Sequence, residues 1–172
     1  MKKLLLMRHG KSDWNKPGQE DSDRPLAPRG QKAAVRIAAW IEEHGLRPDA
    51  ALISTARRTQ ETWRLVKDIF GADASFENRE ALYLASPGEI LEQLAGVADN
   101  PATILIIGHN PGLESLTNLL AGPGSDDSAL ADLQRGFPTA ALAVFELAGD
   151  SWPDLGSDGA RLAEFVRPRD FV

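Results

Sequence analysis

Apolar residues along the chain follow two different patterns. Continuous apolar runs at residues 4–7, 50–53 and 103–107 end abruptly in polar residues, which is typical of strands buried on both faces of a sheet. Between these runs, apolar residues recur at helical spacing and predict amphipathic helices. The positions are Ala34, Ile37, Ala38 and Ile41; then Thr62, Leu65, Val66 and Ile69; and then Leu113, Leu116 and Leu120.

Small and polar residues mark the ends of these predicted elements. Gly45 and Gly71 follow the first two helical patterns and are typical C-terminal stops. Ser54 and Thr55 are candidates for the N-cap of the second helix. The sequence Ser86-Pro87-Gly88-Glu89 has the form of a capping box and predicts the start of another helix.

The order of the predicted elements defines the fold class. Strands alternate with helices, residues 139–147 and 161–166 add two late strands, and residues 11–27 and 122–138 are polar connections, the second with a short helix. Repeated strand–helix units favour a parallel sheet covered by helices on both faces. We therefore expect one domain over residues 1–172, an α/β fold with three α/β/α layers and a mostly parallel central sheet.

Composition narrows the classes of function. The chain has 172 residues, a net charge of −6 and no Cys. The acidic balance argues against nucleic-acid binding, and the lack of Cys excludes disulfides, thiolate catalysis and Cys-ligated zinc. No apolar stretch approaches the roughly 20 residues of a membrane span, and the first one is too short for a signal peptide. We expect a cytoplasmic protein with no membrane or nucleic-acid partner, and a monomer is favoured.

Three strand–helix junctions carry the candidate chemistry. Arg8 and His9 follow the first strand, Arg57 and Arg58 stand at the start of the second helix, and His109 follows the strand at 103–107. Parallel strands place such junctions at one edge of the sheet, where ligands of these folds bind. Arginine at a helix N-terminus, where the helix dipole favours anions, indicates an anionic ligand. Phosphate is the obvious candidate.

Each junction also has a purely structural interpretation. Alone, Arg8 and His9 could be polar residues at a strand end and His109 a turn histidine, whereas the three junctions together favour the anion site. His44, near the end of a helix, is interpreted as structural. A catalytic zinc usually has three protein ligands, and no H-E-x-x-H spacing or glycine-rich nucleotide motif is present. We therefore expect neither a metal nor a cofactor.

Four motifs occur in order along the chain. Residues 8–15 fit R-H-G-x-x-x-W-N, and residues 23–30 are similar to D-x-P-L-[ST]-x-x-G. Residues 54–62 are similar to S-x-x-x-R-[AT]-x-x-T, which selects Arg58 rather than Arg57, and residues 108–112 read G-H-N-P-G. This set resembles the histidine phosphatase (phosphoglycerate mutase-like) superfamily over nearly the whole chain. The short length, F-P-T-A at 137–140 and R-P-R at 167–169 most resemble the SixA-type phosphohistidine phosphatases.

The resemblance implies a metal-independent phosphatase. His9 would be the nucleophile and would form a phosphohistidine that water later hydrolyses. Its imidazole must be neutral to attack, and Arg8, Arg58 and His109 would lower its pKa. The same three side chains would bind the phosphoryl oxygens, so arginine would supply the charge that a metal supplies elsewhere.

The resemblance also suggests further site residues. It implies substrate binding by Asn15, Gly10 and Ser12. Members of the superfamily often protonate the leaving group with a Glu after the second helix, and the spacing of Glu80 from Tyr83 loosely fits that position. SixA-type members often lack this acid because the P–N bond of phosphohistidine is labile, so Glu80 is either a general acid or a solvated loop residue.

Three functions fit these residues. The first is hydrolysis of phosphohistidine on a protein, the second is hydrolysis of a small phosphorylated metabolite with Glu80 as the acid, and the third is phosphate binding without catalysis. The third is disfavoured because His9 and its partners are present. Between Glu80 and His109 the pattern leaves room for one helix and one strand, without the long segment that covers the site in mutases. An open site favours a phosphorylated protein over a small phosphate ester.

Overall fold

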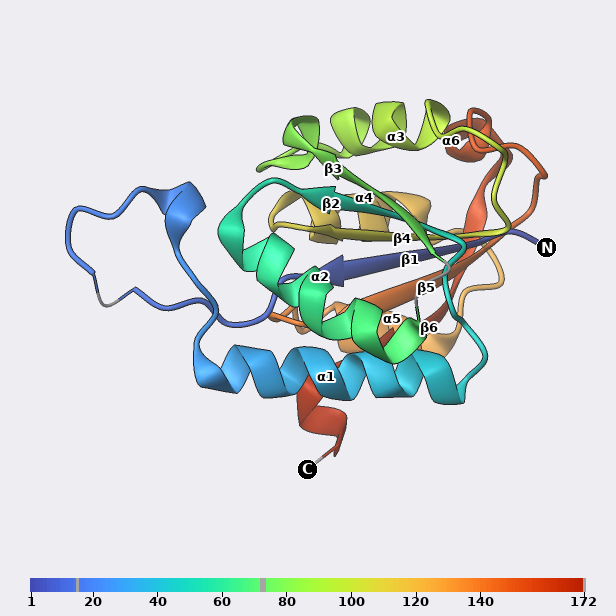
Figure 1. The fold of residues 1–172 in the computed structure, drawn as a ribbon. Helices are drawn as coiled ribbons and strands as arrows, with labels where there is room; N and C mark the ends of the chain where they lie inside the picture. Colours follow the sequence, from blue (N-terminus) through green and yellow to red (C-terminus); the bar gives the residue numbers. More distant parts are fainter. Residues whose placement is uncertain (15, 72–73, 172) are drawn as a thin grey trace.

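The computed structural model describes residues 1–14, 16–71 and 74–171 (Figure 1). A six-stranded sheet with the order β3-β2-β4-β1-β5-β6 forms its centre. The strands are β1 (Lys3–Arg8), β2 (Ala50–Ser54), β3 (Ser75–Arg79), β4 (Thr103–Gly108), β5 (Leu142–Leu147) and β6 (Ala160–Val166). The first four pair in parallel, β5 is antiparallel to β1, and β6 is antiparallel to β5. The prediction of a mostly parallel sheet is therefore confirmed.

Helices cover both faces of this sheet. They are α1 (Pro28–Glu43), α2 (Arg57–Phe70), α3 (Pro87–Ala95), α4 (Gly112–Leu120), α5 (Asp127–Leu133) and α6 (Leu155–Asp158), with short 3-10 turns η1 (Asp21–Asp23), η2 (Glu80–Leu82) and η3 (Pro168–Phe171). Leu5 and Met7 of β1 pack with α1 and α2, whereas Leu4 and Leu6 pack with α3, α4 and α5. This alternation gives the three α/β/α layers that the sequence predicts.

Two strands differ from the predictions. Strand β3 was not predicted because its sequence, Ser-Phe-Glu-Asn-Arg, has no apolar run; it is an exposed edge strand that pairs with β2 alone. The strand predicted from residue 139 begins instead at Leu142, because Ala140 has a φ of 62° and cannot continue a strand. Gly45 and Gly71 have φ values of 66° and 81°, as their predicted role in ending helices requires.

The topology brings the predicted junctions together. Strands β1, β2 and β4 are neighbours and run parallel, so all three end at the same edge of the sheet. Figure 1 shows residues 11–14 and 16–27, in blue, projecting from this edge beyond the arrowhead of β1. Within the described part of the chain, no helix is long and apolar enough to cross a membrane.

Candidate active site

His9 lies directly after β1 with its ring buried and oriented by the backbone. Its Nδ1 is 2.7 Å from the carbonyl oxygen of Gly10. Because a carbonyl only accepts, Nδ1 carries the proton and Nε2 presents a lone pair. The Nε–H of Arg58 donates to this Nε2 over 3.3 Å. Burial, aided by the charges of Arg58 and Arg8, lowers the pKa of His9 to about 3, so the imidazole is neutral at pH 7.

His109 follows β4 and faces the same guanidinium. Its Nδ1 lies 3.3 Å from Nη2 of Arg58, and its Nε2 lies 2.7 Å from Oγ of Ser54. A guanidinium only donates, so Nδ1 accepts and Nε2–H donates to the serine. The two imidazole centroids are 5.4 Å apart. Burial first, then the charge of Arg58, lowers the pKa of His109 to about 3, and this ring is neutral as well.

The contact between Ser54 and His109 explains an error in the predicted helix start. The N-cap of α2 is Ala56, which makes no side-chain capping bond, and not Ser54 or Thr55. The Ser54 hydroxyl accepts from the Ala56 N–H at 3.3 Å and orients the histidine. Ser54 is therefore part of the site, although its residue type and position in the sequence had indicated only an N-cap.

Arg58 and its neighbour Arg57 have different environments. Arg58 is 2% exposed and bridges the two histidines from the first turn of α2. Arg57 is exposed and forms an ion pair with Glu61, with 2.9 Å between Nε and Oε2. One position along a helix rotates a side chain by about 100°, which is why adjacent arginines point to different surroundings.

Asp21 and Tyr83 complete the cluster and were not anticipated as site residues. Arg58 donates to the carbonyl oxygen of Asp21 at 2.8 Å and to its Oδ2 at 3.0 Å, and the Tyr83 hydroxyl donates to the same carboxylate. The Tyr83 ring meets that of His109 edge-on at 5.4 Å. Burial raises the pKa of Asp21, but hydrogen bonds from Tyr83, Arg24 and Arg58 outweigh it and hold the pKa well below its usual range. Asp21 is thus an anion that positions Arg58, and not a proton donor.

Arg8 is the last residue of β1, and not all of its guanidinium donors have hydrogen-bond partners. Its Nη1 donates to the carbonyl oxygen of Phe137 at 2.9 Å, while its buried Nε has no hydrogen-bond partner among the described residues. Burial, opposed by the charge of Glu114, lowers the pKa of Arg8. Arg8 lines a hollow of about 260 Å³, and a guanidinium donor without a partner suits an anion such as a phosphoryl group.

Two of the three predicted substrate-binding residues make hydrogen bonds to other residues of the protein. The N–H of Gly10 already donates to Oγ1 of Thr62 at 3.1 Å, and a Cβ at this position would lie 2.6 Å from the Gly30 carbonyl oxygen, so only glycine fits. The hydroxyl of Ser12 accepts a hydrogen bond from Arg24. Asn15 lies outside the described residues. Substrate binding by these three residues stays a prediction.

Glu80 lies on η2 with an exposed side chain. Its carboxylate makes no hydrogen bond or ion pair to another described residue, while its carbonyl oxygen accepts from the Tyr83 N–H at 2.9 Å. Its role as an acid stays a prediction. Across the described residues, no group of three His, Cys, Asp or Glu side chains could hold a metal ion.

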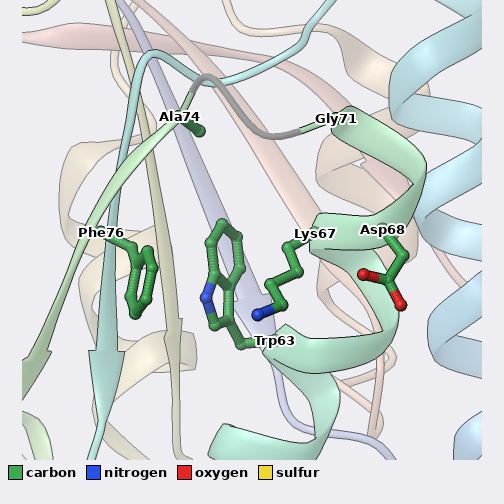
Figure 2. A pocket seen from close by; sticks show the side chains of 6 residues that line it. All are labelled: Trp63, Lys67, Asp68, Gly71, Ala74 and Phe76. Atoms are coloured by element: carbon green, nitrogen blue, oxygen red, sulfur yellow. The ribbon is translucent and has the colours of Figure 1, made fainter.

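A second hollow, of about 420 Å³, lies between α2 and β3 (Figure 2). We call it the α2–β3 hollow; it is lined by Trp63, Lys67, Asp68, Gly71, Ala74 and Phe76. The Trp63 and Phe76 rings are 5.5 Å apart, and Nζ of Lys67 is 5.8 Å from the Phe76 centroid. None of the predicted catalytic residues lines it.

Two neutral imidazoles joined by arginine at the carboxyl edge of a parallel sheet define a phosphatase-type anion site. The family model of the histidine phosphatase superfamily (branch 1) matches residues 4–83. An uncharacterized protein of Mycobacterium tuberculosis is 38% identical over 164 residues, which cover 95% of this chain and all of the relative. The chain belongs to the histidine phosphatase superfamily.

Similar solved structures indicate which type of histidine phosphatase this chain is. A candidate phosphohistidine phosphatase SixA from Nakamurella multipartitia is 32% identical, with a TM-score of 0.81, and the match covers 97% of this chain and 96% of that one. A candidate phosphohistidine phosphatase SixA from Agrobacterium tumefaciens is 29% identical, also with a TM-score of 0.81, over 97% of this chain and 98% of that one. The chain is a SixA-type phosphatase.

Proposed function

We propose that this chain, acting as a single catalytic domain over residues 1–172, hydrolyses phosphohistidine carried on a protein. The observation that carries the proposal is the Arg58 bridge between Nε2 of His9 and Nδ1 of His109. A nitrogen that accepts from a guanidinium is unprotonated, so Nε2 of His9 can attack phosphorus once the Arg58 N–H turns to a phosphoryl oxygen. The same cation neutralises charge on the transferred group.

The reaction has two displacements at phosphorus. Nε2 of His9 attacks, a new P–N bond forms, and the P–N bond of the substrate breaks. The leaving imidazole takes a proton from solvent or from Glu80. Water then attacks the phosphohistidine at position 9, which releases inorganic phosphate and restores His9. Arg8 and Arg58 bind the equatorial oxygens in both steps, and His109 donates to them once its Nδ1 carries a proton in place of the hydrogen bond from Arg58.

The short segment between Glu80 and His109 supports a protein substrate. Between Glu80 and His109 the chain forms only η2, α3 and β4, all of which belong to the described residues. A small metabolite would find few remote contacts there, and such contacts supply specificity. The two SixA candidates that the chain resembles carry the same assignment in their names.

A turnover comparison tests the proposal. We expect kcat/KM on a histidine-phosphorylated phosphotransfer protein to exceed that on phosphoglycerates and sugar phosphates by at least about tenfold, which is about 1.4 kcal/mol. Glu80→Gln should change the phosphohistidine rate little. A small ester that is hydrolysed faster, together with a large loss in Glu80→Gln, would instead establish the metabolite function.

A further inference from the structure

Three adjoining hollows run from Arg8 along α1 and share the side chain of Arg169. The hollow at Arg8 has a volume of about 260 Å³, the next about 210 Å³, and the one along α1 about 530 Å³. Pro138 lines the first two, and Arg29 lines the last two. Helix α1 packs against η3, and Figure 1 shows η3, in red, directly beside it.

The charge of these hollows opposes that of the whole chain. The net charge of the chain is −6, yet every charged residue that lines the three hollows, apart from Glu114, is basic. We define the basic groove by six of these residues, which are Arg29, Lys32, Arg36, Arg135, Arg167 and Arg169. A local basic surface on an acidic protein indicates selection for an anionic ligand at that place.

Most of these cations are available to a ligand. Arg29, Lys32 and Arg36 are exposed at i, i+3 and i+7, on one face of α1. Arg135 and Arg169 are also exposed. None of the five side chains forms an ion pair with another described residue.

Arg167 forms the fixed wall of the groove. It is 8% exposed, and its Nη2 pairs with Asp132 at 3.3 Å and with Asp170 at 2.9 Å. Its Nη1 is buried and has no hydrogen-bond partner among the described residues. A buried guanidinium donor without a partner is costly unless a ligand accepts from it.

The groove begins at Arg8, which the proposed mechanism assigns to phosphate binding. Arg8 lines its first hollow and immediately precedes His9. From Arg29 to Arg36 the helix rises about 10 Å, and an extended chain advances about 3.3 Å per residue. A few residues that flank a phosphohistidine would therefore reach along the α1 part of the groove.

We propose that the basic groove binds an acidic segment of the phosphoprotein substrate, next to its phosphohistidine. This inference rests on the proposed function. Arginine binds carboxylates in paired hydrogen bonds, and the groove offers several arginines in a row. A polyanionic nucleic acid would extend beyond the groove along a chain whose net charge is −6, which favours a short carboxylate-rich segment instead.

Direct binding tests the groove without catalysis. The probes are two fluorescent peptides without phosphate, which are identical except that four Glu residues in one are Gln in the other. Anisotropy should show the wild type binding the Glu peptide at least tenfold more tightly than the Gln peptide. The double variant Lys32→Glu/Arg36→Glu should abolish this preference. Equal binding of both peptides, or tighter binding of a single-stranded oligonucleotide, would overturn the proposal.

A matched pair of variants separates the groove from overall charge. Arg36→Glu and Arg64→Glu change the same residue type on exposed helical surfaces, and Arg64 lies on α2, outside the groove. We expect Arg36→Glu to weaken binding of the Glu peptide at least threefold and Arg64→Glu to weaken it less than 1.5-fold. Equal losses would mean that only net charge matters and would refute the groove.

The same peptides with a phosphohistidine connect the groove to turnover. The ratio of kcat/KM for the Glu peptide to that for the Gln peptide should be at least about five in the wild type and close to one in Lys32→Glu/Arg36→Glu. If the wild type hydrolyses both peptides at equal rates, the groove does not select substrates. If it hydrolyses neither, the proposed function is wrong, and anisotropy still decides whether the groove binds acidic chains.

Discussion

The histidine–arginine cluster at the carboxyl edge and the α2–β3 hollow both use helix α2, but the cluster joins distant segments of the chain and the hollow does not. Arg58 on its first turn meets His9 and His109, which come from two other junctions of the fold. Trp63 and the rest of the α2–β3 hollow come from one stretch of sequence, residues 63–76, and mainly pack apolar rings (Figure 2). The hollow is roomier than the one beside Arg8, yet it holds no nucleophile. Volume is therefore a poor guide to chemistry in this fold, and convergence of distant charged groups is a better one.

Removal of the nucleophile should give the largest effect. We expect His9→Ala to lower kcat by at least about 10³-fold, or about 4 kcal/mol, because the proposed phosphohistidine at position 9 can no longer form. Its unfolding free energy should fall by only about 1 kcal/mol, the value of a hydrogen bond. Rapid quenching with labelled substrate should leave acid-labile phosphate on the wild type and none on the variant. Acid-stable label on the wild type would contradict a histidine intermediate.

Truncation of a side chain in the α2–β3 hollow should lower stability and leave turnover almost unchanged. Trp63 is 3% exposed, and Trp63→Ala removes a large buried ring, which should cost about 3–5 kcal/mol of unfolding free energy. Turnover per folded molecule should stay within about threefold of the wild type. Urea denaturation and active-site titration measure the two quantities. A catalytic loss with unchanged stability would show that the hollow belongs to the active site.

The two adjacent arginines should differ sharply. Arg58→Ala should cost about 2–4 kcal/mol of transition-state stabilisation, comparable to loss of an oxyanion-hole donor. Arg57→Ala loses an exposed pair with Glu61 and should change kcat/KM less than about twofold. Steady-state kinetics of both variants measure this difference. Arg58→Lys keeps the positive charge but loses the planar set of donors, and it therefore tests whether donor geometry matters. Equal losses of kcat/KM in Arg57→Ala and Arg58→Ala would contradict the special role of Arg58.

The neutral histidines should make stability depend on pH. The folded-state pKa values of His9 and His109 are about 3, against about 6.5 for free histidine. The unfolded chain therefore binds more protons below pH 6.5, and stability falls as the pH is lowered through this window. Each histidine contributes up to about 1.4 kcal/mol per pH unit. Urea denaturation between pH 7 and pH 5 should give a shallower slope for His109→Asn; the wild-type slope in that variant would contradict the lowered pKa.

Removal of metal ions should have the smallest effect. Arg8 and Arg58 already place N–H donors and positive charge around His9. We expect dialysis against a chelator to leave kcat within about twofold, or about 0.4 kcal/mol. A metal Lewis acid would contribute several kcal/mol. A large loss that zinc or magnesium restores would contradict metal-independent catalysis.

Several contacts of the cluster could not be predicted from local sequence. Asp21 contacts Arg58 across 37 positions, and Tyr83 reaches Asp21 across 62. Asp21 is one of several acids in a polar connection, so neither periodicity nor a motif distinguishes it. Only Tyr83 had a signal, its spacing from Glu80, and that spacing drew attention to Glu80 rather than to Tyr83.

The sequence by itself determined the layered α/β fold, the convergence of Arg8, His9 and His109, and the choice of Arg58 over Arg57. The fold and the convergence follow from apolar periodicity and from residue types at strand ends, which are local properties of the chain. The choice of Arg58 follows instead from the resemblance of residues 54–62 to the family's motif. Tertiary structure alone decided that Asp21 holds Arg58, that Ser54 orients His109, and that the basic side chains of α1 and η3 form one groove. The reason is physical: side-chain direction and burial depend on packing between segments far apart in the chain, and local pattern does not encode that packing.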